Sequence, residues 1–392
     1  MSATRVDIVR IQDIRPHPNA DSLEIAYPWG VDGWPVIVRK HLYAVGDLVV
    51  YCPVDSILPQ NIEEIIFPPD SKIKLHRSRV RAIKIRGHIS QGMIICPSDL
   101  HKFLTPEDFE EGRNVAEVLG ITKYEPPANS VPSLMRIGQP KKVKPDLKAF
   151  KKYTDVEHGK YWTRELLRDE TVVVTQKLHG TSFRAGWFKS EANTFWQKVR
   201  KFFGLMPEWT FAWGSRNVQI QVKPGKKHTG CSIESQGVDF GDVYTKMVEQ
   251  YDLRSRIPKG MAIYGEIVGD GIQKGYRYGC KEGEHKLYLY DISINNGSTW
   301  LDYLPNQTDV AYSTFFNVAQ NLELDTVPIL YIGAHSPEKI AEFIDVNPLS
   351  DEVNEGIVVR PAQERSTPHL GRVVLKFVSD AFYLQKQGTD FH

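Results

Sequence analysis

The sequence predicts an α+β protein in which an amino-terminal β-barrel precedes a larger domain of antiparallel sheets with flanking helices. Three observations support this. The first hundred residues hold about five short β-rich segments, separated by Gly and Pro and without a long helical pattern. After residue 156, strand-like segments alternate with helical patterns. Between these parts, residues 126–155 are rich in Pro and Lys, which is typical of an ordered connector.

Composition places the chain among globular proteins. Its 392 residues are enough for two cores, with 41% hydrophobic and 25% charged residues. The net charge of +1 means that any anion-binding surface must be local. We see no targeting signal and no apolar run near the roughly 20 residues of a membrane span, so we expect no membrane contact and a cytoplasmic or, in a eukaryote, nuclear location. The four scattered cysteines are expected to be free thiols.

The first predicted domain covers residues 1–125. A small closed barrel of short strands is typical of the OB-fold, which often binds nucleic acid. The segment from Pro16 to Leu23 also resembles the start of tRNA-binding OB modules. The strand candidates are Val6 to Ile14, Leu23 to Tyr27, Val36 to Arg39, Leu48 to Cys52, Val80 to Ile85 and Met93 to Cys96.

A dense basic stretch lies between these strands. In an extended chain, Arg77, Arg79 and Arg81 would share one face. Contact with phosphates and a merely solvated face both remain open for this stretch. Its members are Lys72, Lys74, Arg77, Arg79, Arg81, Lys84 and Arg86.

Three helix signals follow. Thr105 with Pro106, and Ser336 with Pro337, combine a capping hydroxyl with proline in the first turn. A helical pattern also runs from Asp242 to Leu253. The aromatic and basic segment from Glu191 to Trp209 is either a packed helical insertion or a surface that stacks on bases.

The central motif is Thr171 to Phe183, where a β-branched run ends in a polar turn holding Lys177, His179 and Gly180. A lysine becomes a nucleophile only when it loses its proton, so its pKa must fall by roughly 3 units from about 10.4. Taken alone, the Lys-x-x-Gly pattern favours an ordinary solvated lysine in a turn.

Five later segments favour a nucleophilic lysine over a solvated one, because each sets a charged or aromatic residue beside an apolar run. In this order they resemble the covalent nucleotidyltransferase superfamily, and most closely ATP-dependent RNA ligases of the nick-sealing branch. The strongest match is Gly265 to Lys274. The resemblance implies an adenylyltransferase domain at residues 156–392. The five segments are Phe211 to Asn217, Ile263 to Gly269, Leu287 to Ile292, Glu355 to Arg360 and Val373 to Phe377.

The resemblance also implies roles for the residues that bind the nucleotide. Lys177 would attack the α-phosphate of ATP and carry AMP as a phosphoramidate. Gln176 would read the adenine edge, and Tyr290 would stack on the base. Arg216 would bind phosphate or ribose, and Glu266 would accept hydrogen bonds from the ribose hydroxyls.

Four further residues complete the implied site. Glu355 would hold hydrated Mg²⁺ or Mn²⁺. Lys376 would contact the α-phosphate, and with the metal it would lower the pKa of Lys177. His179 and Asp291 would act near the adenylate.

One position departs from the family pattern. Many RNA ligases carry Lys-x-Lys in the last motif, but here Val378 occupies the second lysine position. We expect either a missing phosphate contact or compensation by Arg360, Arg372 or Lys386.

The sequence therefore predicts a monomeric RNA ligase that joins a 3′-hydroxyl to a 5′-phosphate at nicks in duplex RNA or an RNA·DNA hybrid. Two alternatives stay open. One is an mRNA-capping guanylyltransferase, which would form its adduct from GTP. The other is a non-catalytic RNA-binding protein on a ligase scaffold, which the missing second lysine makes conceivable.

Overall fold

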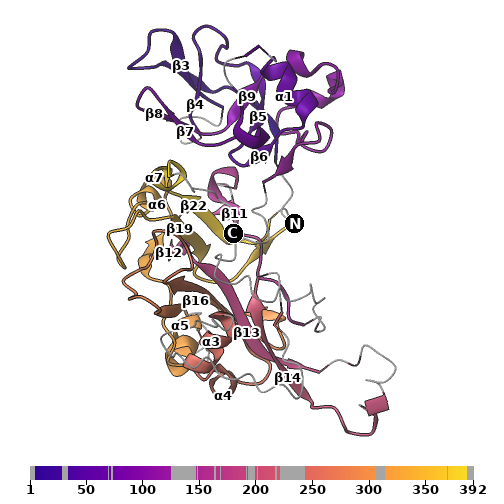
Figure 1. Cartoon of the computed structure of the whole chain (residues 1–392), viewed down its shortest axis with the longest axis vertical. Coiled ribbons are helices and arrows are strands. Elements are labelled where there is room, and N and C mark those ends of the chain that lie inside the picture. Colours follow the sequence, from indigo (N-terminus) through magenta and orange to yellow (C-terminus); the bar gives the residue numbers. More distant parts are fainter. Residues whose placement is uncertain are drawn as a thin grey trace. The chain divides into compact units, whose positions relative to one another are not determined.

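The chain forms two compact units (Figure 1), which we describe separately. The first comprises Met1–Pro127 and Val378–Phe391, and the second comprises Ala128–Phe377. The sequence prediction placed the final residues in the second domain, whereas they group with the first. Most of the predicted connector lies outside the described residues. The computed structural model describes residues 5–28, 34–68, 70–71, 74–124, 147, 149–162, 165–167, 169–190, 192, 199–200, 202–216, 219–220, 243–305, 314–368 and 370–385.

The first unit is built from short antiparallel strands and contains an apolar core. Its sheets have the orders β1-β5-β9, β2-β3-β4, β10-β6 and β7-β8. Val50, Ile8 and Ile62 are among the fully buried residues of the core. The strands are β1 (Asp7–Arg10), β2 (Asp13–Pro16), β3 (Leu23–Tyr27), β4 (Val36–Arg39), β5 (Leu48–Cys52), β6 (Ser56–Ile57), β7 (Ile83–Ile85), β8 (His88–Ser90), β9 (Met93–Ile95) and β10 (Thr122–Lys123).

Three predicted strands of this unit have the bounds that the structure shows, namely β3, β4 and β5. The predicted strand from Val6 to Ile14 is instead divided into β1 and β2. The helices of this unit are α1 (Gln60–Ile66), α7 (Asp380–Tyr383) and three short 3-10 helices at His76–Ser78, Pro97–Leu100 and Pro106–Asp108. The predicted helix start at Thr105 is confirmed, because its backbone N–H and hydroxyl both donate to Asp108, at 2.8 and 2.9 Å.

The predicted strand from Val80 to Ile85 is shorter in the structure, where β7 covers Ile83–Ile85, so the three arginines of the basic stretch do not lie on it. Arg77 lies in a 3-10 helix with a φ of 58°, which breaks the alternation that would align it with its neighbours. Arg79 is taken up by the fold, because its Nε donates to Asp55 at 2.8 Å and its guanidinium lies 3.8 Å from the Tyr124 ring centroid. Lys72 lies outside the described residues. Exposed cations remain at Lys84 and Arg86 on the β7–β8 hairpin.

The second unit contains two five-stranded sheets with the orders β11-β22-β19-β12-β18 and β14-β13-β15-β16-β17. β12 pairs antiparallel with β18 and β19, the strands of the second sheet also pair antiparallel, and β11 runs parallel to β22. The strands are β11 (Glu157–His158), β12 (Thr171–Lys177), β13 (Thr181–Lys189), β14 (Trp209–Ser215), β15 (Ala262–Gly269), β16 (His285–Ile294), β17 (Thr299–Trp300), β18 (Ile329–Ala334), β19 (Gly356–Pro361) and β22 (Leu375–Val378), with a small β20 (Ser366–Thr367) and β21 (Gly371–Arg372) pair.

Five helices flank these sheets among the described residues. The signal at Ser336 is confirmed, because its hydroxyl accepts the Lys339 N–H at 3.1 Å. The pattern from Asp242 to Leu253 forms α3 and the start of α4, although Asp242 itself lies outside the described residues. The helices are α3 (Val243–Gln250), α4 (Leu253–Arg256), α5 (Phe315–Asn321), α6 (Pro337–Ala341) and a 3-10 turn at Gly159–Tyr161.

The two faces of β12 explain its β-branched run. Val172 and Val174 pack in one core with Ile340 of α6. Val173 joins the core built by the second sheet, which includes Phe183. Because side chains alternate along a strand, Lys177 lies on the face of Val173 and points toward the second sheet.

The α+β prediction is confirmed by these two sheets with flanking helices and by the β-rich first unit. Within the described part of the chain, no helix has the length and apolar character needed to cross a membrane. Cys52, Cys96 and Cys280 are free thiols, and Cys231 lies outside the described residues.

Candidate active site

Lys177 ends β12 directly beside a buried carboxylate. Its Cα partner across the strand pair is Gly356 of β19, the residue after Glu355. Lys177 Nζ lies 2.7 Å from Glu355 Oε1, and the Glu355 side chain is fully buried, whereas that of Lys177 is 13% exposed. His179 Nδ1 lies 3.6 Å from the other oxygen, Glu355 Oε2. Three predicted site residues are therefore in contact at one end of the sheet.

The turn after Lys177 requires glycine for steric reasons. A Cβ at Gly180 would lie 2.3 Å from the Ile267 carbonyl oxygen and 2.8 Å from Glu266 Cγ. The absence of a side chain therefore lets the turn pack against β15. Gln273 Nε2 donates to the Gly180 carbonyl at 2.9 Å and holds it there. This packing gives a physical reason for the Lys-x-x-Gly spacing.

Two tyrosines fix His179, and the sequence interpretation did not include them. The His179 N–H donates to Tyr278 Oη at 2.8 Å. The Tyr276 ring meets the imidazole edge-on at 4.8 Å between centroids. Both tyrosines follow shortly after the Gly265 to Lys274 motif. Their position next to the strongest sequence match is the signal by which they could have been included in the predicted site.

Glu266, on β15 of the second sheet, lies near Lys177 and Glu355. Burial raises the pKa of Glu266 to about 8, and the nearby Glu355 charge adds to this effect. The Lys177 ammonium, the Gly180 N–H and the Ser182 hydroxyl oppose the rise. Glu266 is therefore close to Lys177 and Glu355, and burial favours its protonated form when no nucleotide is bound.

We expect this proton to make stability depend on pH. In the unfolded chain Glu266 ionises near its ordinary pKa of 4.5, so the folded chain binds more protons between that pH and about 8. Native stability should fall across this window relative to Glu266→Gln, by at most about 1.4 kcal/mol per pH unit. Urea unfolding of both proteins at pH 5, 6.5 and 8.5 measures this difference. A constant difference at the three values would contradict the assigned protonation.

Lys376 lies on the same face of the sheet as Lys177. Its strand, β22, neighbours β19, which neighbours β12. Leu375 and Phe377 pack into the core on the α6 side. Alternation therefore directs the buried Lys376 to the opposite face, the one that carries Lys177.

Gln176 faces away from this group. Its Nε2 donates to Asn347 Oδ1 at 2.8 Å and Asn354 Oδ1 at 3.1 Å. As the residue before Lys177 on a strand, it points to the α6 side with Val174. The structure does not bring this amide together with the other predicted nucleotide-binding side chains.

Tyr290 and Arg216 approach Glu266 from the second sheet. Burial raises the pKa of Tyr290 well above its ordinary value, the Glu266 charge adds to the shift, and the Arg216 charge opposes it. The Tyr290 ring packs edge-on against Tyr153 at 4.9 Å. Arg216 follows β14 and pairs with Asp155. The half-buried aromatic face and the guanidinium therefore lie near the carboxylate assigned to the ribose.

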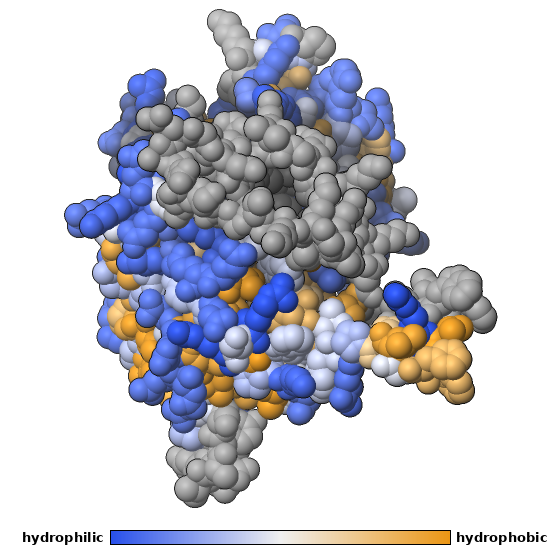
Figure 2. All heavy atoms as spheres, turned by 60° about the horizontal axis from the view of Figure 1, so that its bottom comes forward, coloured by the Kyte–Doolittle hydropathy of each residue, from blue (hydrophilic) through white to orange (hydrophobic). Residues whose placement is uncertain are grey.

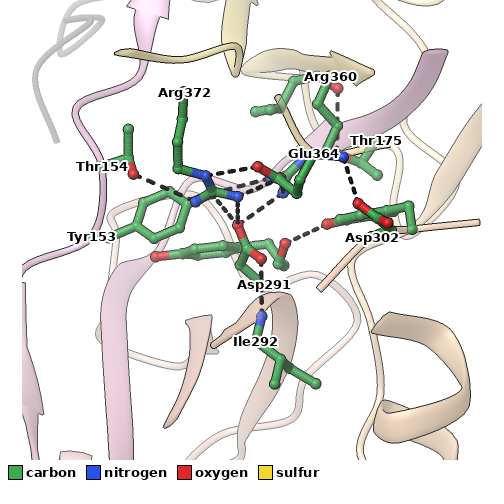
Figure 3. Close-up of polar contacts among 12 residues, drawn as sticks. Tyr153, Thr154, Thr175, Asp291, Ile292, Asp302, Arg360, Glu364 and Arg372 are labelled. Atoms are coloured by element: carbon green, nitrogen blue, oxygen red, sulfur yellow. Dashed lines mark hydrogen bonds and ion pairs between the residues drawn. The ribbon is translucent and has the colours of Figure 1, made fainter. Parts of the chain in front are cut away.

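Asp291 lies in a buried ion-pair cluster (Figure 3). Its Oδ2 accepts from Arg360 Nη1 and Arg372 Nη2, both at 2.9 Å, and from Tyr153 Oη at 2.8 Å. Glu364 pairs with Arg372 on the other side. Burial opposes ionisation, but the guanidiniums of Arg372 and Arg360 outweigh it and hold the pKa of Asp291 below its ordinary value.

This cluster corrects one expectation from the sequence. Arg360 and Arg372 are buried and pair with Asp291, so neither is free to replace the missing phosphate contact at Val378. Lys386, the third candidate, lies outside the described residues. The hydrogen bonds that Asp291 Oδ2 accepts come from members of this cluster, Tyr153, Arg360 and Arg372.

The donor set suits a hard divalent cation. Glu355 offers carboxylate oxygens, and Mg²⁺ or Mn²⁺ in phosphate chemistry needs only one or two carboxylates. Among the described residues, no group of three or more His, Cys, Asp or Glu side chains could hold a metal ion. A metal ion bound to Glu355 would take its remaining ligands from water and phosphate oxygens.

The chain is similar in fold to solved structures of an RNA ligase. Naegleria gruberi RNA ligase with PPi is 22% identical, with a TM-score of 0.65, and 96% of each chain is covered. A lysine variant of the same ligase with AMP and Mn is 21% identical, with a TM-score of 0.67, and 96% of this chain and 97% of that one are covered. These likenesses show the fold. No curated protein matches the chain.

Family models cover both parts of the chain. An OB-fold domain model matches residues 5–97, which confirms the predicted barrel class. The RNA ligase model matches residues 170–378, which is more than half of the chain and includes Lys177, Glu266, Glu355 and Lys376. The chain therefore belongs to the RNA ligase family.

Proposed function

We propose that the protein is an ATP-dependent RNA ligase that acts through a lysyl-AMP intermediate at Lys177. The Lys177 amine attacks the α-phosphate of ATP and pyrophosphate leaves. AMP then moves to a 5′-phosphate of RNA, and a 3′-hydroxyl attacks that phosphate and releases AMP. The observation that carries this proposal is the 2.7 Å contact of Lys177 Nζ with buried Glu355, beside Glu266.

The surrounding residues divide the work of binding. Tyr290 offers an aromatic face to adenine, and Glu266 accepts from the ribose hydroxyls once it has lost its proton. Arg216 and Lys376 supply fixed positive charge to the phosphates. His179 shares Glu355 with Lys177 and orients that carboxylate.

Glu355 has two tasks in this scheme. Without nucleotide it pairs with the Lys177 ammonium, and it is the nearest base for the proton that Lys177 must lose. It is also the first candidate ligand for Mg²⁺ or Mn²⁺, which when bound supplies positive charge to the triphosphate. The N. gruberi ligase structures with ATP and Mn support ATP and a divalent cation as the cofactors.

The β7–β8 hairpin of the barrel suits contact with duplex phosphates. Lys84 and Arg86 are exposed, and no ion pair is formed by either within the described part of the chain. The turn between them and β8 is held in place, because Asn19 Nδ2 donates to the Arg86 carbonyl at 2.9 Å. We therefore assign this domain to the RNA flanking the nick, with binding that weakens as salt rises.

Incubation with labelled nucleotide tests the chemistry. We expect a covalent adduct from ATP and none from GTP, with pyrophosphate released. An adduct formed only from GTP would favour the capping alternative. The absence of any adduct would favour a non-catalytic RNA-binding protein.

Nicked duplexes in which the ribose positions vary test the substrate. Sealing should require a 3′-hydroxyl and a 5′-phosphate held on a complementary strand. Equal sealing of free single-stranded ends would contradict a preference for nicks, although the adenylation result would still stand.

A further inference from the structure

The hairpin of β13 and β14 ends in an unusually large insertion. Residues 190–208 join the two strands, whereas two to five residues usually suffice. The stem is firmly closed, because Ser190 N–H donates to the Glu208 carbonyl at 2.9 Å and the Lys189 N–H donates to Asn296 Oδ1 at 3.0 Å. The insertion therefore begins from a fixed base.

The described end of this insertion is a defined helical turn. The Phe203 N–H donates to the Val199 carbonyl at 3.1 Å, and the Leu205 N–H donates to the Arg200 carbonyl at 2.8 Å. Gly204 has a φ of 66°, the left-handed conformation that commonly ends a helix. This backbone fixes the direction of the neighbouring side chains.

Three large apolar side chains at this turn face solvent. Phe202 is 86% exposed, Phe203 66% and Leu205 71%. The two phenyl rings meet edge-on at 5.4 Å. Figure 2 shows hydrophobic side chains standing out from the body of the molecule at this end of the hairpin. The packed-insertion interpretation is therefore wrong for these residues, and such a patch indicates a binding surface.

The charge around the patch favours one class of partner. The insertion contains the cations Lys198, Arg200 and Lys201, and its two acidic residues, Glu191 and Glu208, stand at its ends in the sequence. Among these, Arg200 is exposed at the turn that carries the phenyl rings. Cations beside exposed aromatic faces are the combination that binds single-stranded nucleic acid, through phosphates and stacked bases.

We propose that Phe202, Phe203 and Arg200 form a tip that binds unpaired nucleotides of the RNA substrate. The bases of a duplex already stack on one another, so only an unpaired segment beside the nick can offer a free base to the rings. This inference rests on the proposed ligase function and adds a second RNA contact outside the catalytic residues.

Equilibrium binding without ATP tests the tip. The probes are a nicked RNA duplex and the same duplex with a single-stranded tail of about ten nucleotides. The native protein should bind the tailed duplex about tenfold more tightly. Phe202→Leu with Phe203→Leu should remove this preference, and Phe202→Tyr with Phe203→Tyr should keep it. Equal binding of both probes by the native protein would overturn the proposal.

The leucine pair also separates base stacking from ordinary apolar contact. Leucine keeps the apolar surface but has no aromatic face, so tail preference that survives the leucine pair overturns the proposal. Adduct formation with ATP should be unchanged in both double variants. If the native protein forms no adduct, the proposed function fails, but the tail preference can still be measured independently.

Discussion

Lys177→Ala should abolish the covalent adduct with ATP and lower sealing of a nicked duplex by at least about a thousandfold. Lys177 is the proposed nucleophile, and its Nζ lies 2.7 Å from Glu355 Oε1, so this variant lacks the amine that attacks the α-phosphate. Labelled ATP followed by denaturing electrophoresis measures the adduct. RNA that already carries AMP on its 5′-phosphate should still be sealed, because that substrate bypasses the step that needs Lys177.

Two further variants keep this result interpretable. Lys177→Arg retains a cation beside the buried Glu355, yet a guanidinium is not a nucleophile at neutral pH, so the adduct should be lost while thermal stability is kept. Lys189→Ala changes the lysine that ends the neighbouring strand, where it lies over Trp209, and it should leave the adduct unchanged. An adduct of native intensity in either Lys177 variant would rule out this lysine as the nucleophile.

The strands that carry the site were predictable because they are apolar runs with one polar residue at an end. The run Val172 to Val174 and the Gly356 to Pro361 segment have this form, and both became central strands of one sheet. Pairing those strands brings Lys177 to Glu355, although 178 residues separate them. The family order of the motifs supplied that pairing, since local sequence alone does not specify it.

The partners of buried charges were not predictable in the same way. Arg360 and Arg372 appeared as free cations in the sequence, but they pair with Asp291 from 69 and 81 residues away. Arg79 likewise pairs with Asp55, so its charge does not contribute to a basic surface. Whether an arginine is buried depends on tertiary packing around it, and a single sequence carries no local sign of that. The same limit applies to Gln176, whose asparagine partners lie on the far face of β12.

Asp291→Asn should destabilise the folded protein strongly, by about 3–5 kcal/mol. The change removes the carboxylate that two buried guanidiniums share and leaves them with Glu364 as their remaining acid in the cluster. Asp291 lies on β16 and Arg360 on β19, so the cluster also joins the two sheets of the second unit. Chemical denaturation at neutral pH measures the loss of unfolding free energy.

Glu342→Gln is the matched control, because it breaks an exposed pair with Lys339 and should cost less than about 1 kcal/mol. Adding Arg360→Met to Asp291→Asn should recover part of the lost stability, since one unpaired buried charge is then removed. These results would make Asp291 a positioning residue that acts through the sheet packing. If Asp291→Asn kept native stability but blocked adduct formation, Asp291 would instead act directly on the adenylate, and the structural assignment would be wrong.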